Sequence, residues 1–241
     1  MKSKINIVLL IFLLSISLSA CSTNKTDSAK SSKFSPEETN SLPIDTYKAV
    51  LQNQAGFIST DDNHEVFLND FLSRDSKYEG TYKVTRFTVL DLDGDQIPEV
   101  VLELSLDYPE QYEILYYCNG TVYGYNVVYR GFEMLKEDGT YSYANSASDV
   151  GVEKISCFKP DSLGKVTLGY AQMASDDSNT EMSYFIHDAS VNKEAFDVFL
   201  DQQNEKKDMQ WYEFSAENIE AKVFMDSNIH SSLKAADNIK Q

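Results

Sequence analysis

The sequence predicts an α+β fold, in which an antiparallel, multi-stranded β-meander carries helices from both ends of the chain. Three observations lead to this prediction. Short apolar runs separated by turn residues follow one another through the middle of the chain, as in sheets whose neighbouring strands are joined by hairpins. Runs with helical spacing occur before and after these strands. No regular alternation of strand and helix is present, which argues against a parallel nucleotide-binding sheet.

Composition divides the chain into four segments, predicted as an N-terminal signal peptide (residues 1–20), a flexible tether (21–42), a single globular domain (43–227) and a frayed tail (228–241). The tether prediction rests on a stretch of Ser, Thr, Asn, Lys, Asp and Glu with almost no apolar residues. Such a stretch buries too little apolar surface to offset the entropy of ordering.

The first 20 residues have the parts of a secretory signal. Lys2 and Lys4 precede an apolar run over residues 5–18, too short for a comfortable membrane span, and small residues precede Cys21. This arrangement resembles the bacterial lipoprotein signal, in which an aliphatic residue and two small residues precede Cys. The resemblance implies that Cys21 becomes the first mature residue and carries thioether-linked diacylglycerol, at the extracellular face of the cell membrane. An ordinary signal with an incidental Cys, or a short anchor helix, is the alternative.

The charge balance limits the partners of the chain. It has 21 basic and 38 acidic residues, a formal net charge of −17. Such a surface repels nucleic acid and anionic lipid headgroups. It favours divalent cations, or solubility alone. Membrane association is therefore expected through the lipid on Cys21 and not through surface charge, and no nucleic-acid partner is expected.

Two helices are expected before the first strand. Apolar residues recur at helical spacing over residues 43–54, and Pro43 suits the first helical position. Asp62 and Glu65 have the spacing of a capping box, which predicts a second helix ending near Arg74.

The strands follow in order. Residues 81–90 and 97–106 are predicted to flank an acidic loop, with Phe87 and Leu102 on the apolar faces and Glu103 toward water. Asn-Gly at 119–120 and Asp-Gly at 138–139 predict two hairpins. A third turn is expected through Pro160 and Gly164, followed by a strand over residues 182–186.

The C-terminal part returns to helices. Asn192 is expected to cap a helix running to about residue 203, and Ser215 a last helix. Between them, the aromatic residues of segment 211–214 predict a short strand or a docking segment.

The acidic loop, residues 91–99, is the predicted metal site. Carboxylates stand at its first, third, fifth and ninth positions, and Gly94 permits a tight turn. Ca²⁺ binds six to eight oxygen atoms at about 2.3–2.6 Å and tolerates irregular geometry. The predicted ligands are the carboxylates of Asp91, Asp93, Asp95 and Glu99 and the backbone carbonyl of Ile97. The alternative is a metal-free acidic turn at Asp93-Gly94, against which the mutual repulsion of four carboxylates counts.

The stretch is not an EF-hand, which needs Gly at position six and Glu at position twelve. It resembles the β-hairpin calcium loops of integrin-type FG-GAP and VCBS repeats, which are acidic at positions one, three, five and nine. This chain departs from them with Glu99 in place of Asp, and with Gln96 where Gly is frequent. The resemblance implies a structural Ca²⁺ that ties two strands together. One copy does not support a propeller of such repeats.

A wider resemblance covers most of residues 45–225. The lipoprotein signal, the helical start, the lead-in at 85–90 with its acidic hairpin, and the meander from 122–125 to 138–140 resemble uncharacterised lipoproteins of Gram-positive bacteria. This implies surface display and transfers no activity.

Two further features have open interpretations. Cys118 and Cys157 could form a disulfide outside the cytoplasm, or each could be a buried thiol, and free thiols are slightly favoured. The many tyrosines of residues 112–143 could form an exposed row for stacking on sugars, including wall glycans. Cross-strand aromatic packing is the favoured interpretation.

The leading functional hypothesis is a non-enzymatic, membrane-anchored extracellular domain with one structural Ca²⁺ and a role in binding or envelope interaction, its partner a wall glycan or a protein. No nucleophile elbow, Ser-x-x-Lys, His-Glu-x-x-His or phosphate-binding loop occurs in the sequence, and no catalytic residue is assigned. The alternatives are a cell-envelope hydrolase using acidic residues, a carbohydrate-binding module and, last, a solute receptor of a transport system.

Overall fold

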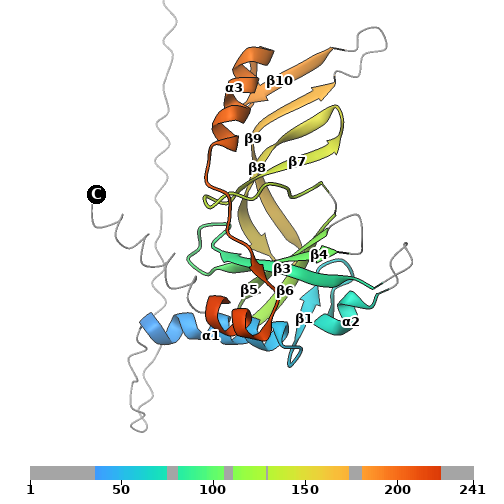
Figure 1. Ribbon diagram of the computed structural model, residues 1–241, viewed down its shortest axis with the longest axis vertical. Helices are drawn as coiled ribbons and strands as arrows, with labels where there is room; N and C mark the ends of the chain where they lie inside the picture. Colours follow the sequence, from blue (N-terminus) through green and yellow to red (C-terminus); the bar gives the residue numbers. More distant parts are fainter. Residues whose placement is uncertain (1–35, 75–80, 106–110, 129, 174–180, 224–241) are drawn as a thin grey trace, which may run out of the picture. The chain divides into compact units, whose positions relative to one another are not determined.

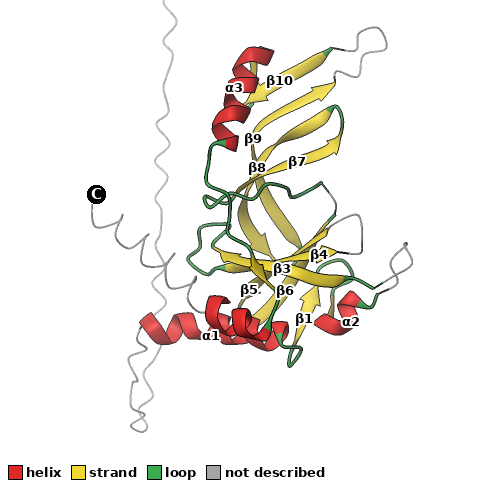
Figure 2. Ribbon diagram, in the orientation of Figure 1, coloured by secondary structure: helices red, strands yellow, loops and turns green. Residues whose placement is uncertain are grey.

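The computed structural model describes residues 36–74, 81–105, 111–128, 130–173 and 181–223. All of them belong to one compact unit, Ser35–Gln241. The predicted signal peptide, Cys21 and the predicted tail at 228–241 lie outside the described residues. Within these residues the predicted α+β class is confirmed, with strands in two mostly antiparallel sheets and a few short helices (Figure 2).

The first sheet has seven strands in the order β12-β3-β4-β5-β6-β1-β2. Its neighbours pair antiparallel except β1 and β6, which run parallel. The strands are β1 Gly56–Ser59, β2 His64–Phe67, β3 Lys83–Leu90, β4 Glu99–Ser105, β5 Gln111–Cys118, β6 Thr121–Val127 and β12 Tyr212–Glu213.

The second sheet has five antiparallel strands in the order β11-β10-β9-β8-β7. They are β7 Thr140–Ser146, β8 Asp149–Lys159, β9 Ser162–Met173, β10 Met182–Ile186 and β11 Ala189–Val191. The predicted meander is therefore divided between two sheets, with the break between β6 and β7 (Figure 1).

The hairpin turns follow local sequence. Asn119 and Gly120 take φ of 51° and 90° between the paired ends of β5 and β6, as the predicted two-residue turn requires. The third turn, predicted through Pro160 and Gly164, lies earlier in the chain than expected. Lys159 pairs with Ser162, so the turn comprises residues 160–161, and Gly164 lies within β9. A Cβ at Gly164 would lie 2.6 Å from Sγ of Cys157 on the paired strand β8. Glycine therefore avoids a steric overlap at this position.

The helices are α1 Pro36–Leu51, α2 Leu68–Leu72, α3 Lys193–Asn204 and a last helix described over residues 216–223. The predicted start of the first helix was wrong, because Pro43 lies inside α1 and not at its first turn. There it removes one backbone donor from the helix interior. Two caps were predicted correctly. Oδ1 of Asn192 accepts from Ala195 N at 2.9 Å, and Oγ of Ser215 accepts from Asn218 N at 3.2 Å.

The predicted capping box was also wrong. Glu65 lies in β2 and pairs with Ile58 of β1, because tertiary strand pairing overrides the local signal at this position. Helix α2 begins at Leu68, and its preceding residue makes no side-chain cap. Oδ1 of Asn53, 16 residues earlier, instead accepts from Asn69 N at 2.9 Å. The free N–H at this helix start is thus satisfied from a distant part of the chain.

Two hydrophobic clusters cover the two faces of the first sheet. Phe87, Val100 and Leu102 join one cluster with residues of α1 and of the last helix. Val101 and Ile114 join the other with residues of β7, β8 and the segment before β12. Both faces of the central strands are therefore buried. This overturns the prediction that Glu103 points to water, since its exposed fraction is 5%.

The structure tests the predictions made for the tyrosines and the cysteines. Tyr116 and Tyr123 are cross-strand partners whose rings stack at 5.3 Å, which confirms cross-strand aromatic packing at this pair. Cys118 and Cys157 are both free thiols. Segment 211–214 contributes the edge strand β12, where Tyr212 pairs with Phe87. In the part of the chain that is described, no helix has the length and apolarity to cross a membrane.

Candidate metal centre

The acidic loop closes the hairpin between β3 and β4. The two strands remain paired up to Leu90 and Glu99, so residues 91–98 form the connection. Two of its residues have left-handed backbone angles, with φ of +88° at Gly94 and +76° at Gln96. Glycine adopts this conformation without strain, whereas a residue with a Cβ does so at a cost. The turn function assigned to Gly94 is consistent with its backbone.

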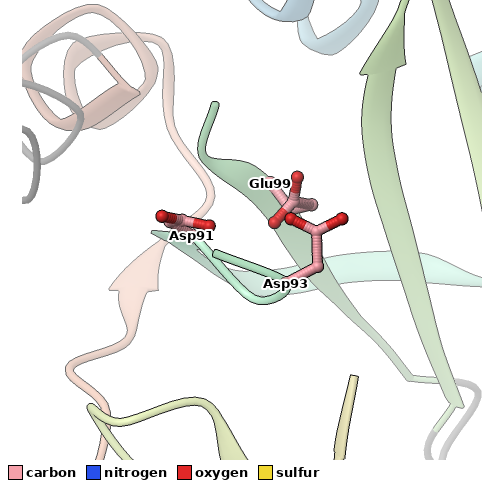
Figure 3. Close-up of side chains that lie close together, drawn as sticks. All are labelled: Asp91, Asp93 and Glu99. Atoms are coloured by element: carbon pink, nitrogen blue, oxygen red, sulfur yellow. The ribbon is translucent and has the colours of Figure 1, made fainter. Parts of the chain in front are cut away.

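The loop brings three of the predicted carboxylates together. One oxygen from each of Asp91, Asp93 and Glu99 lies within 4.8 Å of the others, with the side chains gathered at the end of the hairpin (Figure 3). Asp95 is exposed, and its carboxylate does not belong to this group. Ile97 is half-buried, and its N–H donates to Oδ1 of Asp95 at 2.7 Å.

Backbone amides within the loop hold these carboxylates in position. Oδ1 of Asp91 accepts from Gly94 N at 2.6 Å, and its Oδ2 accepts from Gln96 N at 3.3 Å. Oδ1 of Asp93 accepts from Asp95 N at 3.1 Å. Aspartates in tight turns often bond to the backbone two or three residues on. The loop conformation is thus encoded largely in its own sequence.

One contact reaches the loop from the second sheet. The N–H of Phe158 in β8 donates to Oδ2 of Asp93 at 3.2 Å, across 65 residues of sequence. Sequence reasoning missed this contact, because the position of β8 depends on how the two sheets meet. Asp93 consequently accepts hydrogen bonds from two separate parts of the fold.

Glu99 is the most enclosed of the three acids, with an exposed fraction of 2%. Its Oε2 accepts from Leu92 N at 2.7 Å. Burial raises the pKa of Glu99 well above its usual value, and the negative charges of Asp93, Asp95 and Asp91 raise it further, while the Leu92 hydrogen bond opposes the shift. A nearby cation would favour the ionised form and reverse this shift.

The geometry suits one metal ion. Two oxygens that are both about 2.4 Å from an ion can be at most ~4.8 Å apart, which is the separation that contains the three carboxylate oxygens. The cluster could therefore hold a cation. The backbone hydrogen bonds also stabilise the acids without an ion, so a metal-free turn remains the competing interpretation.

No family model, curated protein or solved structure matches this chain. The resemblance to FG-GAP and VCBS hairpins, and the wider one to Gram-positive lipoproteins, therefore stay predictions from the sequence. The assignment of the site rests on the carboxylates and their surroundings alone.

Proposed function

We propose that this protein is a lipid-anchored domain at the extracellular face of the cell membrane, with a Ca²⁺ ion bound by its acidic loop. Its role is binding or envelope interaction and not catalysis. The observation that carries the metal assignment is the convergence of Asp91, Asp93 and Glu99 within 4.8 Å. In this role the ion joins the ends of β3 and β4.

Calcium is favoured over other cations by the chemistry of the loop. All donors are oxygen atoms, which excludes the sulfur and imidazole ligands typical of zinc and copper sites. Mg²⁺ requires near-ideal octahedral geometry, whereas Ca²⁺ accepts the irregular positions that a short loop offers. Asp95, which faces solvent, and the carbonyl of Ile97 are the further ligands proposed, with water completing the shell.

The buried carboxylate of Glu99 explains why an ion would stabilise the fold. Without a cation, a charge at this position is desolvated and is surrounded by other negative charges. Binding of Ca²⁺ offsets that repulsion. We expect weak binding, with Kd on the order of 10⁻⁴–10⁻³ M as in extracellular modules, and stabilisation that grows with the logarithm of ion concentration.

The direct test is calorimetric titration of Ca²⁺ into the full-length chain in detergent, together with melting temperatures. Wild type should release or absorb heat in a saturable titration and should melt at a higher temperature with Ca²⁺. Asp93→Ala should lose both effects. Asp197→Ala, which removes an exposed carboxylate of α3, is the matched control and should behave as wild type. Absence of heat and of any melting shift in wild type would remove the ion from the proposal.

The anchor is tested separately. We expect the wild-type chain, expressed in a Gram-positive host, to be recovered in the membrane fraction. Its mature N-terminal peptide should begin at Cys21 and carry the mass of diacylglycerol. Cys21→Ala should leave the protein without this added mass. An unmodified Cys21 in the wild-type membrane fraction would contradict the lipid anchor while leaving the calcium assignment untouched.

A further inference from the structure

A cavity of about 300 Å³ lies beside the second hydrophobic cluster and away from the acidic loop. Its walls come from three strands of the first sheet, from the segment around residues 132–135 and from the segment leading into β12. The residues that carry the argument are Arg86, Glu103, Tyr112, Phe132, Asp208 and Trp211. None of them takes part in the proposed metal site.

The sheet contributes a continuous row of three side chains. Arg86 pairs with Glu103, and Glu103 pairs with Tyr112, across β3, β4 and β5. Directly opposed residues of antiparallel strands project on the same face. Nε of Arg86 donates to Oε1 of Glu103 at 3.0 Å, and Oγ1 of Thr85 donates to the same oxygen at 2.7 Å. This side of the cavity therefore presents a guanidinium, a carboxylate and an aromatic ring in sequence.

The Glu103 carboxylate is held in its charged form. Burial raises the pKa of Glu103, but the hydrogen bonds from Arg86 and Thr85 outweigh burial and leave the pKa below its usual value. An ionised carboxylate accepts hydrogen bonds and donates none. The cavity thus contains a strong acceptor beside the donors of Arg86.

Aromatic rings form a connected wall next to this row. The ring centroids of Tyr112 and Trp211 are 5.9 Å apart, and those of Tyr112 and Phe132 are 5.5 Å apart. The guanidinium of Arg86 lies over the Trp211 ring, 5.6 Å from its centroid. Phe132 itself is buried, so the ring surface open to the cavity is that of the half-buried Tyr112 and Trp211. The cavity combines this apolar surface with the polar groups of Arg86 and Glu103.

The charges at the cavity are paired. Glu103 forms an ion pair with Arg86, and Asp208 forms one with Lys136, whose side chain is 3% exposed. Nζ of Lys136 also donates to the carbonyl of Asn204 at 3.2 Å. An anionic ligand would meet a chain of net charge −17. A cationic ligand would have to compete with these existing partners for a carboxylate.

We propose that this cavity binds a neutral saccharide unit. The C–H face of a pyranose ring is apolar and packs on aromatic rings, while its hydroxyl groups both donate and accept hydrogen bonds. Hydroxyl groups are neutral, so they can hydrogen-bond at the edge of the Arg86–Glu103 ion pair without replacing either charge in it. The volume lies at the small end of ligand sites, which span about 300–1,000 Å³, and this size fits one or two sugar units. The proposal does not depend on calcium or on the lipid anchor.

Trp211 provides a reporter at the site, because it is the single tryptophan of the chain. Full-length protein, purified in a detergent without a sugar headgroup, is titrated with glucose, maltose, N-acetylglucosamine and its β-1,4-linked disaccharide. Choline and acetate serve as charged probes. At least one neutral sugar should shift Trp211 emission saturably, with Kd on the order of 1 mM for a ligand of this size. The same sugar should protect Trp211 from quenching by acrylamide.

A matched pair of variants locates the binding. Tyr112→Leu removes one aromatic wall and should weaken binding at least fivefold. Tyr170→Leu removes a half-buried tyrosine that stacks on Phe185 in the second sheet, and should bind as wild type does. If Tyr112→Leu does not fold, acrylamide protection of the wild-type protein decides the question. No response to any neutral sugar at roughly 50 mM, or saturable binding of choline or acetate at Trp211, overturns the proposal.

Discussion

The backbone N–H of Phe158 lies 3.2 Å from Oδ2 of Asp93 and donates a hydrogen bond to it. This contact joins β8 of the second sheet to a side chain proposed to bind calcium in the first. An ion that fixes Asp93 would therefore act on both sheets. Hydrogen exchange at the Phe158 amide can therefore report ion binding at Asp93 locally, without a measurement of the melting temperature.

We predict that Ca²⁺ slows hydrogen exchange at the Phe158 amide. If exchange requires release of Asp93 from the ion, an ion concentration ten times Kd should slow it about tenfold. Amide exchange measured by NMR is the test, and the amides of β10 are the internal control. Equal exchange rates at Phe158 with and without bound ion would show that Asp93 is not a ligand.

We predict opposite effects of Glu99→Gln with and without calcium. A raised carboxyl pKa means that the folded state binds the proton more tightly, so this group's contribution to stability falls as pH rises through the folded-state value. Gln carries no charge and retains an oxygen for the Leu92 N–H. The variant should therefore melt above wild type at pH 8 in EDTA.

In saturating calcium the order should reverse. An ion at 100 times Kd stabilises wild type by about 2.7 kcal/mol, and Glu99→Gln should lose most of that gain. Differential scanning calorimetry of wild type and Glu99→Gln, each in EDTA and in Ca²⁺, provides the four melting temperatures required. A calcium-induced melting shift of equal size in both proteins would exclude Glu99 from the site.

We predict that Gln96→Gly stabilises the loop. Gln96 has φ of +76°, a conformation that costs a side-chain-bearing residue about 1 kcal/mol more than glycine. The greater freedom of glycine in the unfolded chain removes part of this gain, so we expect at most ~1 kcal/mol in urea unfolding.

The matched control for Gln96→Gly is Gly94→Ala, which makes the opposite exchange. Gly94 has φ of +88°, and a Cβ there would meet no heavy atom within 4 Å. Its expected loss of about 1 kcal/mol is therefore conformational and not steric. If both variants destabilise the protein, the backbone of the loop is not the one described.

We predict that Glu113 makes stability dependent on pH. Glu113 is fully buried in β5, and its Oε2 accepts from Nδ2 of Asn126 at 3.1 Å. Burial raises its pKa to about 8, and the charge of Asp61 adds to the shift. The folded state therefore retains a proton that the unfolded state releases at lower pH. Between the two pKa values, this group lowers the free energy of unfolding by up to about 1.4 kcal/mol per pH unit.

Glu113→Gln should remove that slope, because its amide does not titrate. Urea unfolding of both proteins at pH 6, 7 and 8 measures the difference. The stability of the variant relative to wild type should increase as the pH rises, and should level off above about pH 8, where folded wild-type Glu113 ionises. A constant difference across this range would show that Glu113 is not protonated in the folded state.

We predict that Gly124→Ala destabilises the first sheet strongly. A Cβ at Gly124 of β6 would overlap Oε1 of Glu113 and the ring of Phe57. Overpacking at a buried site typically costs about 1–3 kcal/mol. The Gly124→Ala exchange should cost less stability in a Glu113→Ala background than in wild type, because one of the two overlaps is then absent. Full stability in Gly124→Ala would contradict the packing of β1 against β6.

Features encoded within a few residues were predicted from the sequence. The Asn119-Gly120 turn and the Asn192 cap depend on local backbone preferences. The apolar alternation of β3 and β4 identified residues that enter the core, such as Phe87 and Leu102. The spacing of the acids in loop 91–99 identified three carboxylates that the structure brings together.

Features that depend on distant partners were not predicted. The capping box predicted at Asp62 and Glu65 does not form, because Glu65 belongs to β2, which pairs with β1. Glu103 has the alternation of a solvent-facing residue, yet it is buried, because other parts of the fold cover that face of the sheet. Its pairing with Arg86 and the nearby Trp211 create a cavity for which the sequence offers no local signal.

The sequence by itself determined the fold class, the Asn119-Gly120 turn, most strand positions and the acids of the loop, because backbone angles and side-chain alternation are properties of neighbouring residues. The tertiary structure alone decided that the strands form two sheets, that β1 joins β6 in parallel, and that Phe158 reaches Asp93. These contacts join residues far apart in the chain. They are selected by the burial of apolar surface and the pairing of buried polar groups over the whole fold.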